Sequence, residues 1–538
     1  MLPTSNNKLL SEWKGPYDVV RKLNDVDYLI RIGDKERSFH INMLKKYNER
    51  KTETAAYIES HDLVGEYNIN PDVEDSDMML NVIDKYSTIF SSVPGKIDCL
   101  DYEIRVNAET KPIASRPYSV PFHLKKEVKS EIDKWLEIGV IRESSSDWAS
   151  PLVVVRNTNN SLRLTVDFRK LNPHINTDNY PMPIRETVIE NLHKSKIMTK
   201  LDLTKAFLQI PLKESSKKFT SFVTPWGQFE FNVVPFGIKF ASGLCNRLIK
   251  SILKSCDSFV TSFIDDLVIH SDSIEEHLEH VDIVLSKLSH AGVTLNVKKC
   301  DFAQTDINFL GVKVGNGNVY PDPKKVEAIR NFQVPTNKKT LRSYLGLLSF
   351  YRKFIPNLAM YVSKLTGLLK KGCPDKIRWT DELTDDFKKS RNLICEDAIL
   401  SLPKPGYKFV VQTDASDDAI GAVLGQLRDD DFVPIAFISR VLNTAEKNYA
   451  VVEKECLAVK WAVCYFHDYL FGAKFIVRTD HAPLAWLHKN KDLNSRLMRW
   501  ALRLQSYDFT IEYIKGTENF IADLLSRCPI VLAKEEGV

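Results

Sequence analysis

The sequence predicts an α+β protein built from several domains. Its 538 residues are more than a single domain usually holds, and 43% of them are hydrophobic, which is enough to fill several packed cores. Short apolar runs that end in acidic residues indicate β-strands. Longer segments with apolar residues three and four positions apart indicate helices, and both kinds recur along the chain.

The composition favours a protein that works inside the cell. The net charge is only +4, a mild basic bias that does not by itself identify a nucleic-acid binder. The nine cysteines include no Cys-x-x-Cys pair, which argues against a zinc site, and their odd number and irregular spacing favour reduced thiols. No signal peptide and no long apolar span can be recognised, so we expect no membrane association.

The first segment, residues 1–48, is expected to form a small β-barrel. Its short alternating strands, such as Tyr28–Ile32, are broken by the turn signals Gly15-Pro16 and Gly33-Asp34. Residues 49–76 are polar and acidic with little periodicity, and we interpret them as a linker.

Two adjacent carboxylates, Asp265 and Asp266, lie between two apolar strand-like runs, 259–262 and 267–269. Ionised groups next to apolar surface must be paired or must bind a cation. A tight turn is the alternative, although such turns favour Asn-Gly or Asp-Gly because both central residues need positive φ. Taken alone, the pair fits a turn as well as it fits a metal site.

A third carboxylate, Asp202, ends another short apolar strand earlier in the chain, and the aromatic Phe207 follows it. Three carboxylates from two segments are what a phosphoryl-transfer site with two Mg²⁺ ions requires, because hard cations prefer oxygen ligands. Two such ions, roughly 3.5–4 Å apart, clamp the attacking and the leaving oxygen of an in-line displacement.

A second group of acids lies in the C-terminal part of the chain. Asp414 and Asp480 each end an apolar strand, and Glu455 borders the apolar stripe of an amphipathic helix at 446–471. Asp523 lies in a last helix. Each acid alone is explained equally well as a strand-end turn or a helix cap. In this order and on this strand and helix pattern, the four acids resemble those of ribonuclease H, which implies a second metal site.

Six short motifs of the chain occur in the order found in gypsy-type LTR retrotransposon Pol polyproteins. Within residues 110–320 they are Ala149-Ser150-Pro151, Val166–Asn172, the Asp202 segment, Val234–Gly237, the Asp265-Asp266 hairpin and Phe309–Gly311. The chain therefore resembles the reverse transcriptase–ribonuclease H part of this family. Gly15-Pro16-Tyr17 resembles the module that ends gypsy-type integrases, which implies that the chain is part of a longer polyprotein.

The resemblance implies a right-hand polymerase with fingers, palm and thumb, a helical connection and an α/β ribonuclease H-like domain. The expected boundaries are, in chain order, the integrase-like small β-barrel at 1–48, the linker at 49–76, an N-terminal extension at 77–114, fingers and palm at 115–320, thumb and connection at 321–400, the ribonuclease H domain at 401–528 and a tail at 529–538.

The resemblance also implies metal ligands in two sites. In the polymerase site they are Asp202, Asp265, Asp266 and the main-chain carbonyl of Leu203. In the ribonuclease H site they are Asp414, Glu455, Asp480 and Asp523. Two Mg²⁺ ions per site are expected, with Mn²⁺ as a substitute.

Seven further residues are implied as substrate contacts. Phe207 would be the steric gate against a 2′-hydroxyl, and the other six would contact the triphosphate, the nucleotide and the primer terminus: Arg156 and Arg163, Phe236 and Gly237, and Leu310 and Gly311. Arginine suits phosphate because its planar fork binds two oxygens at once.

By this resemblance we expect an RNA- and DNA-directed DNA polymerase with ribonuclease H activity. Its partners would be an RNA template, a DNA primer, their RNA–DNA hybrid and dNTPs. The expected location is a cytoplasmic particle, with entry into the nucleus as a second expectation. The sequence does not predict an oligomeric state.

Two segments depart from the family pattern. Arg156–Ser161 lacks the lysines of the usual fingertip hairpin, and Lys239–Asn246 lacks a usual proline and carries Cys245 and Asn246 in place of Phe and Gln. Ile514 stands where relatives often carry a mobile histidine. A rival interpretation is therefore a catalytically weak or silent, element-derived nucleic-acid-binding protein; a third is that only the ribonuclease H half works. Retention of all seven carboxylates favours the enzyme.

Overall fold

The structure is a computed structural model, and it divides into two compact units, Met1–Leu63 and Val64–Val538. The residues that it describes are 2–4, 7–12, 19–22, 27–32, 35–40, 67–71, 76–98, 101–107, 109–156, 162–176, 180–355, 358–394, 399–429, 431–480, 495–515, 519 and 522. No helix in this part of the chain is long and apolar enough to cross a bilayer.

The described strands of the first unit form two separate antiparallel sheets. They are β1 (Leu2–Thr4) with β2 (Asn7–Glu12), and β3 (Val19–Lys22), β4 (Asp27–Ile32) and β5 (Lys35–His40). The expected strands are present, but the expected closed barrel is wrong for the described residues, because no ladder joins the two sheets. Alternating patterns specify strands, whereas closure depends on pairing between distant strands that a local pattern does not encode.

The fingers of the second unit contain a five-stranded sheet with the order β7-β12-β11-β8-β9. Its strands and the helix before it are β7 (Ile141–Glu143), β8 (Ser150–Arg156), β9 (Leu162–Val166), β11 (Phe222–Thr224), β12 (Gly227–Phe231) and α2 (Lys125–Glu137). The buried residues Val128, Ile132 and Trp135 recur at helical spacing, so α2 turns one apolar face to the core. β11 and β12 come from after Asp202, so the chain leaves the palm and returns to the fingers.

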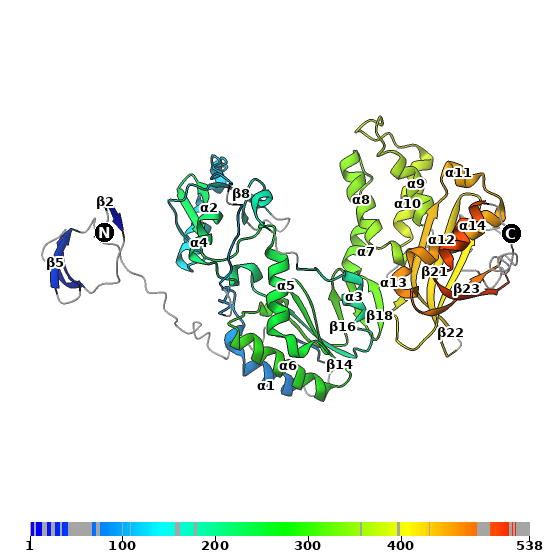
Figure 1. The fold of residues 1–538 in the computed structure, drawn as a ribbon, viewed down its shortest axis with the longest axis horizontal. Coiled ribbons are helices and arrows are strands. Elements are labelled where there is room, and N and C mark those ends of the chain that lie inside the picture. The colour runs from blue at the N-terminus through cyan, green and yellow to red at the C-terminus, as the bar shows by residue number, and fades with distance from the viewer. Residues whose placement is uncertain are drawn as a thin grey trace, which may run out of the picture. The chain divides into compact units, whose positions relative to one another are not determined.

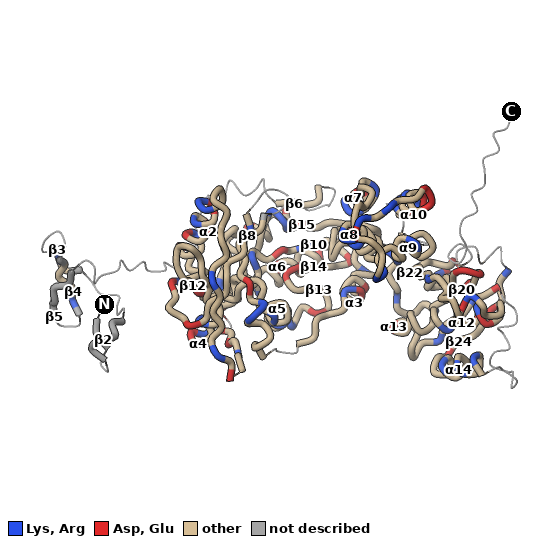
Figure 2. Tube along the Cα trace, turned by 90° about the horizontal axis from the view of Figure 1, so that it is seen from above, with Lys and Arg blue, Asp and Glu red and all other residues tan. Residues whose placement is uncertain are grey.

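The palm is a second five-stranded sheet with the order β13-β14-β10-β15-β6. Its strands are β6 (Asn68–Ile69), β10 (Ile197–Asp202), β13 (Val260–Phe263), β14 (Asp266–Ser271) and β15 (Asp301–Gln304). β6 lies within the segment expected to be a linker, and it pairs with β15. Figure 2 marks acidic residues in red along β10 and β14, which are neighbours in the sheet.

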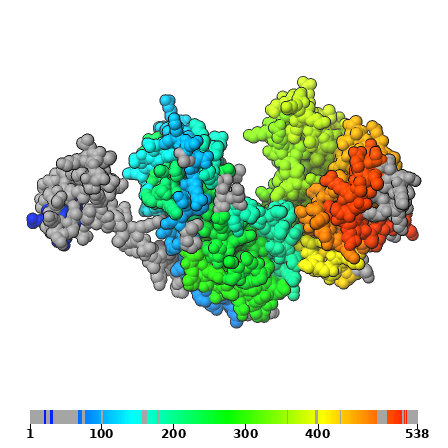
Figure 3. Space-filling model, viewed as in Figure 1, coloured from blue at the N-terminus to red at the C-terminus, as the bar shows by residue number. Residues whose placement is uncertain are grey.

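Helices cover the palm sheet and complete its core. They are α1 (Ser76–Asp84), α3 (Arg185–Glu190), α5 (Ala241–Ile252) and α6 (Ile274–His290). The short helix α4 (Glu214–Lys217) lies with the fingers (Figure 1), where Glu214 forms an ion pair with Arg142 of β7. α6 packs against β10 and β14, and α1 packs against α6 (Figure 1). One hydrophobic cluster continues from the palm into the fingers, and Figure 3 shows the cyan and green surfaces of these segments in contact.

A four-stranded sheet and four helices follow the palm. The strands are β16 (Asp306–Phe309), β17 (Val312–Gly315), β18 (Asn318–Pro321) and β19 (Leu400–Ser401), and the helices are α7 (Pro323–Arg330), α8 (Lys338–Phe350), α9 (Leu358–Gly367) and α10 (Asp381–Asn392). Leu341, Tyr344 and Leu348 of α8 are fully buried, as their helical spacing predicts.

In its described residues, the C-terminal domain contains a five-stranded sheet with the order β22-β21-β20-β23-β24 and four helices. Its elements are β20 (Phe409–Ala415), β21 (Ala419–Arg428), β22 (Asp431–Val441), β23 (Lys474–Thr479), β24 (Asp508–Tyr513), α11 (Thr444–Lys447), α12 (Val451–Tyr465), α13 (His467–Leu470) and α14 (Ser495–Leu504). β20 pairs antiparallel with β21 and parallel with β23, so the carboxyl ends of β20 and β23 meet at one edge. α12 packs on β20 and β21.

Short 3₁₀ turns join these elements. They are Ser87–Ile89, Phe122–Leu124, Asn172–His174, Ala206–Gln209, Lys218–Thr220, Lys254–Cys256, Val297–Lys299 and Arg352–Phe354.

Candidate active sites

The hairpin between β13 and β14 carries two of the predicted carboxylates. Phe263 pairs with Asp266 across the hairpin, so its two turn residues are Ile264 and Asp265, while Asp266 is the first residue of β14. Ile264 has a φ of 60°, a conformation that costs a β-branched residue about 1–3 kcal/mol. Such strain is characteristic of functional sites, where the surrounding structure enforces it. The sequence offered a tight turn and an acidic metal site as alternatives for Asp265 and Asp266. In the structure the two carboxylates lie at and next to a tight turn, so the alternatives do not exclude each other.

Asp202 faces this hairpin from the neighbouring strand. It lies at the end of β10, directly opposite Asp266 in the antiparallel register of β10 and β14. The amide of Leu203 donates a hydrogen bond to the carbonyl of Asp265 at 3.5 Å. The structure therefore brings the three predicted polymerase carboxylates and the Leu203 main chain to one end of the palm sheet.

Two lysines accompany these carboxylates. Lys299 Nζ lies 3.2 Å from Asp202 Oδ2, and Lys200 Nζ lies 3.5 Å from Asp266 Oδ1. Burial raises the pKa of Asp202 and of Asp265, and their carboxylate neighbours raise both further, while Lys299 opposes the shift in each. A carboxylate whose charge is disfavoured by its surroundings is stabilised by a cation, so this donor set fits a divalent metal ion.

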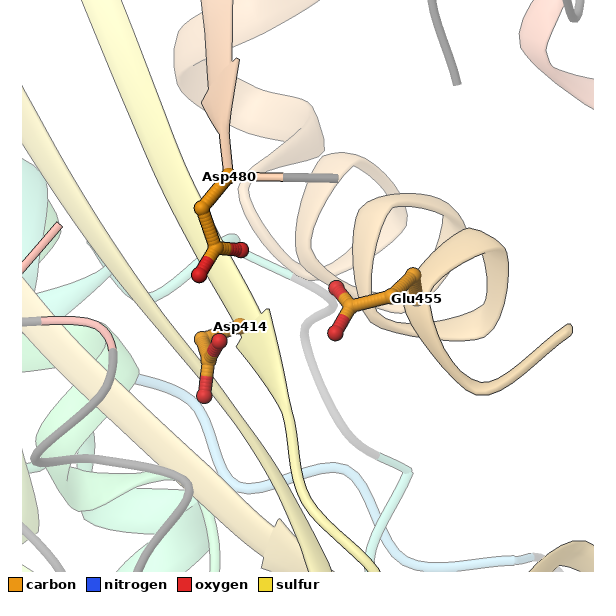
Figure 4. A group of neighbouring side chains, drawn as sticks. All are labelled: Asp414, Glu455 and Asp480. Atoms are coloured by element: carbon orange, nitrogen blue, oxygen red, sulfur yellow. The ribbon is translucent and has the colours of Figure 1, made fainter. Parts of the chain in front are cut away.

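The carboxylates of the C-terminal domain form a tighter group. Asp414 is the second-last residue of β20, Asp480 follows β23, and Glu455 projects from α12, so that all three lie together (Figure 4). Their oxygens lie within 4.8 Å of one another, and Asp414 and Glu455 are buried. This is the only His/Cys/Asp/Glu cluster of that compactness among the residues that the structure describes. Its all-oxygen donor set also fits a hard divalent cation.

Main-chain and amide contacts hold this group in place. The amide of Ala415 donates to Glu455 Oε1 at 3.2 Å, which ties α12 to the end of β20. Asn519 is fully buried, and its Nδ2 donates to the carbonyl of Thr413 at 3.1 Å. Asp523, the fourth predicted carboxylate, lies outside the described residues. Asn519 was not predicted, although it lies only four positions before Asp523 in the sequence.

Comparisons with known proteins agree with this architecture. Residues 155–314 match the family "Reverse transcriptase (RNA-dependent DNA polymerase)", and residues 404–507 match the "RNase H-like domain found in reverse transcriptase". The chain is 40% identical over 425 residues to the retrovirus-related Pol polyprotein of the Drosophila melanogaster transposon 297, covering 78% of this chain and 40% of that protein. The chain is thus similar to the retrovirus-related Pol polyproteins and contains a reverse transcriptase domain and an RNase H-like domain.

Other relatives carry the same family name or architecture. The Pol polyprotein of the Drosophila transposon opus is 38% identical over 443 residues, covering 79% of this chain and 44% of that protein. The Schizosaccharomyces pombe transposon Tf2-3 polyprotein is 34% identical over 441 residues, covering 81% and 33%. The chain thus spans less than half the length of these Pol relatives.

Solved structures confirm the predicted fold class. A foamy viral protease–reverse transcriptase in complex with double-stranded DNA superposes with a TM-score of 0.77 at 20% identity, covering 96% of this chain and 94% of that one. A second foamy viral complex gives 0.76 at 22% identity, covering 85% and 96%. The two family matches leave residues 1–48 outside, so an integrase-derived module there stays a prediction.

Three predicted nucleotide contacts, Phe207, Phe236 and Arg163, lie close to one another. The rings of Phe207 and Phe236 lie edge to face, with centroids 5.4 Å apart, and the Arg163 guanidinium lies 5.6 Å from the Phe236 ring. Gly237 has a φ of +91°, so it needs the conformational freedom of glycine. Arg156 ends β8, but its side chain lies outside the described residues.

Asn172 holds the loop beneath this group, a role the sequence did not predict. Its Nδ2 donates to the carbonyl of Gly237 at 3.0 Å, and its Oδ1 accepts from the amide of Lys239 at 3.0 Å. The side-chain amide of Asn172 thereby joins the motif Val166–Asn172 to the Phe236–Gly237 loop. The only sequence feature that could have indicated this role is that Asn172 belongs to the motif Val166–Asn172.

The departing segment Lys239–Asn246 lies beside the polymerase carboxylates. Cys245 is buried, and its thiol donates to the carbonyl of Ile264 at 3.5 Å, while burial raises its pKa to about 12 and keeps it protonated. Asn246 is fully buried, and neither polar atom of its side chain has a partner among the described residues. An unsatisfied buried group costs about 1–3 kcal/mol. These changes affect the support of the hairpin and leave its ligands in place.

Ile514, at the position of the histidine found in some relatives, follows β24. Its amide donates to the carbonyl of Thr479, the residue before Asp480, at 3.0 Å. The main chain here therefore contributes to the placement of Asp480, while the side chain offers no proton-transfer group.

Proposed function

We propose that the chain is an RNA- and DNA-directed DNA polymerase that also cleaves the RNA strand of an RNA–DNA hybrid. The observation that carries the proposal is the presence of two separate carboxylate sites, one at the hairpin of a reverse transcriptase domain and one at the strand ends of an RNase H-like domain. Solved foamy viral relatives were determined in complex with double-stranded DNA and with an RNA/DNA hybrid, which supports the same partners here.

Two Mg²⁺ ions per site, with Mn²⁺ as a substitute, are the proposed cofactors. Asp202, Asp265, Asp266 and the Leu203 carbonyl would hold them in the palm, and Asp414, Glu455, Asp480 and Asp523 in the RNase H-like domain. When bound, such ions neutralise the charge that develops on the phosphate oxygens and activate the attacking oxygen.

The chain itself supplies position and selectivity. Arg163, whose guanidinium lies over the Phe236 ring, would bind the phosphates of a dNTP, and Phe207 would lie beneath its sugar; the contact between Phe207 and Phe236 supports this arrangement. Leu310 and Gly311 would grip the primer terminus. Contacts to the duplex would go mostly to phosphate and sugar, so template sequence should matter little and high salt should weaken binding. Reverse transcription inside the host cell, first in a cytoplasmic particle, is the proposed setting.

The decisive experiment is primer extension on a heteropolymeric RNA template with Mg²⁺ and dNTPs, in which DNA synthesis and template cleavage are followed together. Both activities in the wild-type protein would support the proposal. Cleavage without extension would support an active RNase H half alone, and the altered segment Lys239–Asn246 would then be the first place to look. Binding of the hybrid with neither activity, across metals and salt, would establish the rival nucleic-acid-binding function.

Replacing Phe207 by Ala should relax the discrimination between dNTPs and rNTPs. Loss of the ring removes the group that would collide with a 2′-hydroxyl, and we expect the efficiency of rNTP insertion relative to dNTP insertion to rise roughly 10- to 100-fold. Single-nucleotide insertion kinetics measure this ratio. Phe219→Ala removes an equally large ring that packs on Trp148, away from Phe207, and should leave the ratio unchanged.

DNA synthesis should be lost at a higher pH than ordinary aspartates would dictate. The pKa values of Asp202 and Asp265 are raised above 3.8, so protonation of these ligands begins above the usual range as pH falls. The folded metal-free protein binds these protons more tightly than the unfolded chain, so its free energy of unfolding rises as pH falls through the raised pKa values. Single-turnover extension from about pH 8 to about pH 5 measures the loss. Excess Mg²⁺ should shift the loss of DNA synthesis to lower pH. A pH profile that does not change with metal concentration would contradict the assignment of Asp202 and Asp265 as metal ligands.

A further inference from the structure

The turn Leu310–Gly311 is fixed from three sides. It joins β16 to β17, and both of its residues have positive φ, 49° at Leu310 and 78° at Gly311. The hydroxyl of Tyr351 donates to the Gly311 carbonyl at 2.7 Å. A Cβ at Gly311 would lie 2.9 Å from Phe350 Cζ, so any other residue would have to displace this ring and would also be strained by the positive φ. The end of α8 thus holds one side of the turn.

Arg185, the first residue of α3, holds the second side. Its Nε donates to the Leu310 carbonyl at 3.0 Å, and its guanidinium lies 4.1 Å from the centre of the Phe350 ring. The side chain is only 20% exposed, so the contact is partly shielded from water. Hydrogen bonds from a charged donor are stronger than neutral ones, and partial burial strengthens them further.

Lys200 holds the third side and reaches the metal-ligand site. It lies two positions before Asp202 on β10, so both side chains project from the same face of the sheet. Its Nζ donates to the carbonyl of Asn308 on β16 at 3.2 Å and lies 3.5 Å from Asp266 Oδ1. One ammonium group therefore joins the strand that leads into the Leu310–Gly311 turn to a carboxylate of the polymerase site.

We propose that Lys200 and Arg185 are positioning residues that fix the primer 3′ terminus relative to Asp266 by anchoring the Leu310–Gly311 turn. The proposal rests on the polymerase function proposed above. The turn has no side chain that could align the terminus by itself, because one residue is glycine and the other is aliphatic. Its placement is therefore set by the donors on its own carbonyls, Arg185 and Tyr351, and by Lys200 on the carbonyl of Asn308 in the strand that leads into it. A displacement of the terminus by 1 Å costs about 10²-fold in rate.

The test compares Lys200→Met, which keeps the length of the side chain and removes the ammonium, with Lys200→Arg, which keeps a cation of similar reach. The maximal extension rate of Lys200→Met should fall roughly 10- to 100-fold while its KM for dNTP changes little. Lys200→Arg should recover most of the rate, and Arg185→Met should behave like Lys200→Met. Lys196→Met, which removes an exposed lysine just before β10, is the matched control and should match the wild type.

Two readouts separate positioning from a merely structural role. RNA cleavage in a preformed hybrid by the same variants should be unchanged, which shows that the chain is folded. A primer with 2-aminopurine at its 3′ terminus, bound in the presence of EDTA, should give a different fluorescence with Lys200→Met than with the wild type, because the terminus is placed differently before any chemistry.

The proposal is overturned if Lys200→Met extends primers at the wild-type rate with an unchanged 2-aminopurine signal. It is also overturned if Lys200→Arg is as slow as Lys200→Met and both lose RNA cleavage, since a packing defect then explains the loss. If the wild type itself does not extend primers but the fluorescence still separates the variants, the proposed polymerase function fails while the positioning role stands.

Discussion

Joint replacement of Asp265 and Asp266 by asparagine should abolish DNA synthesis and leave RNA cleavage intact. The two carboxylates lie at and next to the turn of the β13–β14 hairpin, opposite Asp202. Removing a single preorganised charge-stabilising group from an active site typically costs 10²–10³-fold in rate, so the loss of both should exceed roughly 10³-fold. Primer extension and hybrid cleavage, measured on the same preparation, give the two rates.

The same substitution should not destabilise the metal-free protein. Burial and mutual repulsion raise the pKa of Asp265, which means that its charged form is disfavoured in the folded state at neutral pH. Asparagine removes that charge, so the thermal midpoint of the double variant in EDTA should equal or exceed that of the wild type. Added Mg²⁺ or Mn²⁺ should raise the wild-type midpoint more than that of the variant, because only a ligand that binds the folded state stabilises it.

A matched control is available on the same elements. Asp257→Asn with Asp272→Asn makes an identical charge change at exposed positions on either side of the hairpin strands, and it should retain extension. Continued extension by the Asp265→Asn, Asp266→Asn variant would remove the hairpin from the mechanism. Loss of extension in the control as well would trace the effect to net charge.

The strands that carry the carboxylates were predictable because their signal is local. A charged residue next to an apolar run marks the point where a strand leaves or enters the core. Asp202 ends β10, Asp414 lies next to the end of β20, and Asp266 begins β14. The same reasoning predicted the stripe of α12 that Glu455 borders. What could not be read from these patterns is the pairing of Asp202 with Asp266, because register is set between distant strands.

The residues that support the sites were missed for the same reason. Lys200, Arg185 and Asn172 act through main-chain carbonyls of segments far away in sequence, and a carbonyl has no sequence signature. In the N-terminal segment the local pattern predicted the strands but not their arrangement. Its alternating pattern correctly predicted strands such as β4 and β5, but the expected closure into a barrel depended on contacts between sheets that the pattern does not encode.

Replacing Asp480 by asparagine should abolish RNA cleavage and leave DNA synthesis on a DNA template unchanged. Asp480 is the least buried member of the Asp414–Glu455–Asp480 group, so an amide of the same shape fits there without a packing change. Their oxygens lie within 4.8 Å of one another, and a cation shared by the three would lose a charged ligand. We expect cleavage to fall at least roughly 10²-fold.

On an RNA template the variant should make full-length DNA that stays annealed to intact RNA. Gel analysis with label on the template and label on the primer separates the two outcomes. Asp431→Asn, at the exposed start of β22, is the control for loss of one negative charge in the same domain and should cleave normally.

The two carboxylate sites lie in separate sheets with separate hydrophobic cores, which is why their losses should be independent. Mutations at sites without shared partners usually add in free energy, and here they act on different reactions. A fall in DNA synthesis with Asp480→Asn on a DNA template would therefore show that the RNase H-like domain contributes to holding the duplex during polymerisation. Unchanged synthesis with lost cleavage would establish two enzymes that share one substrate.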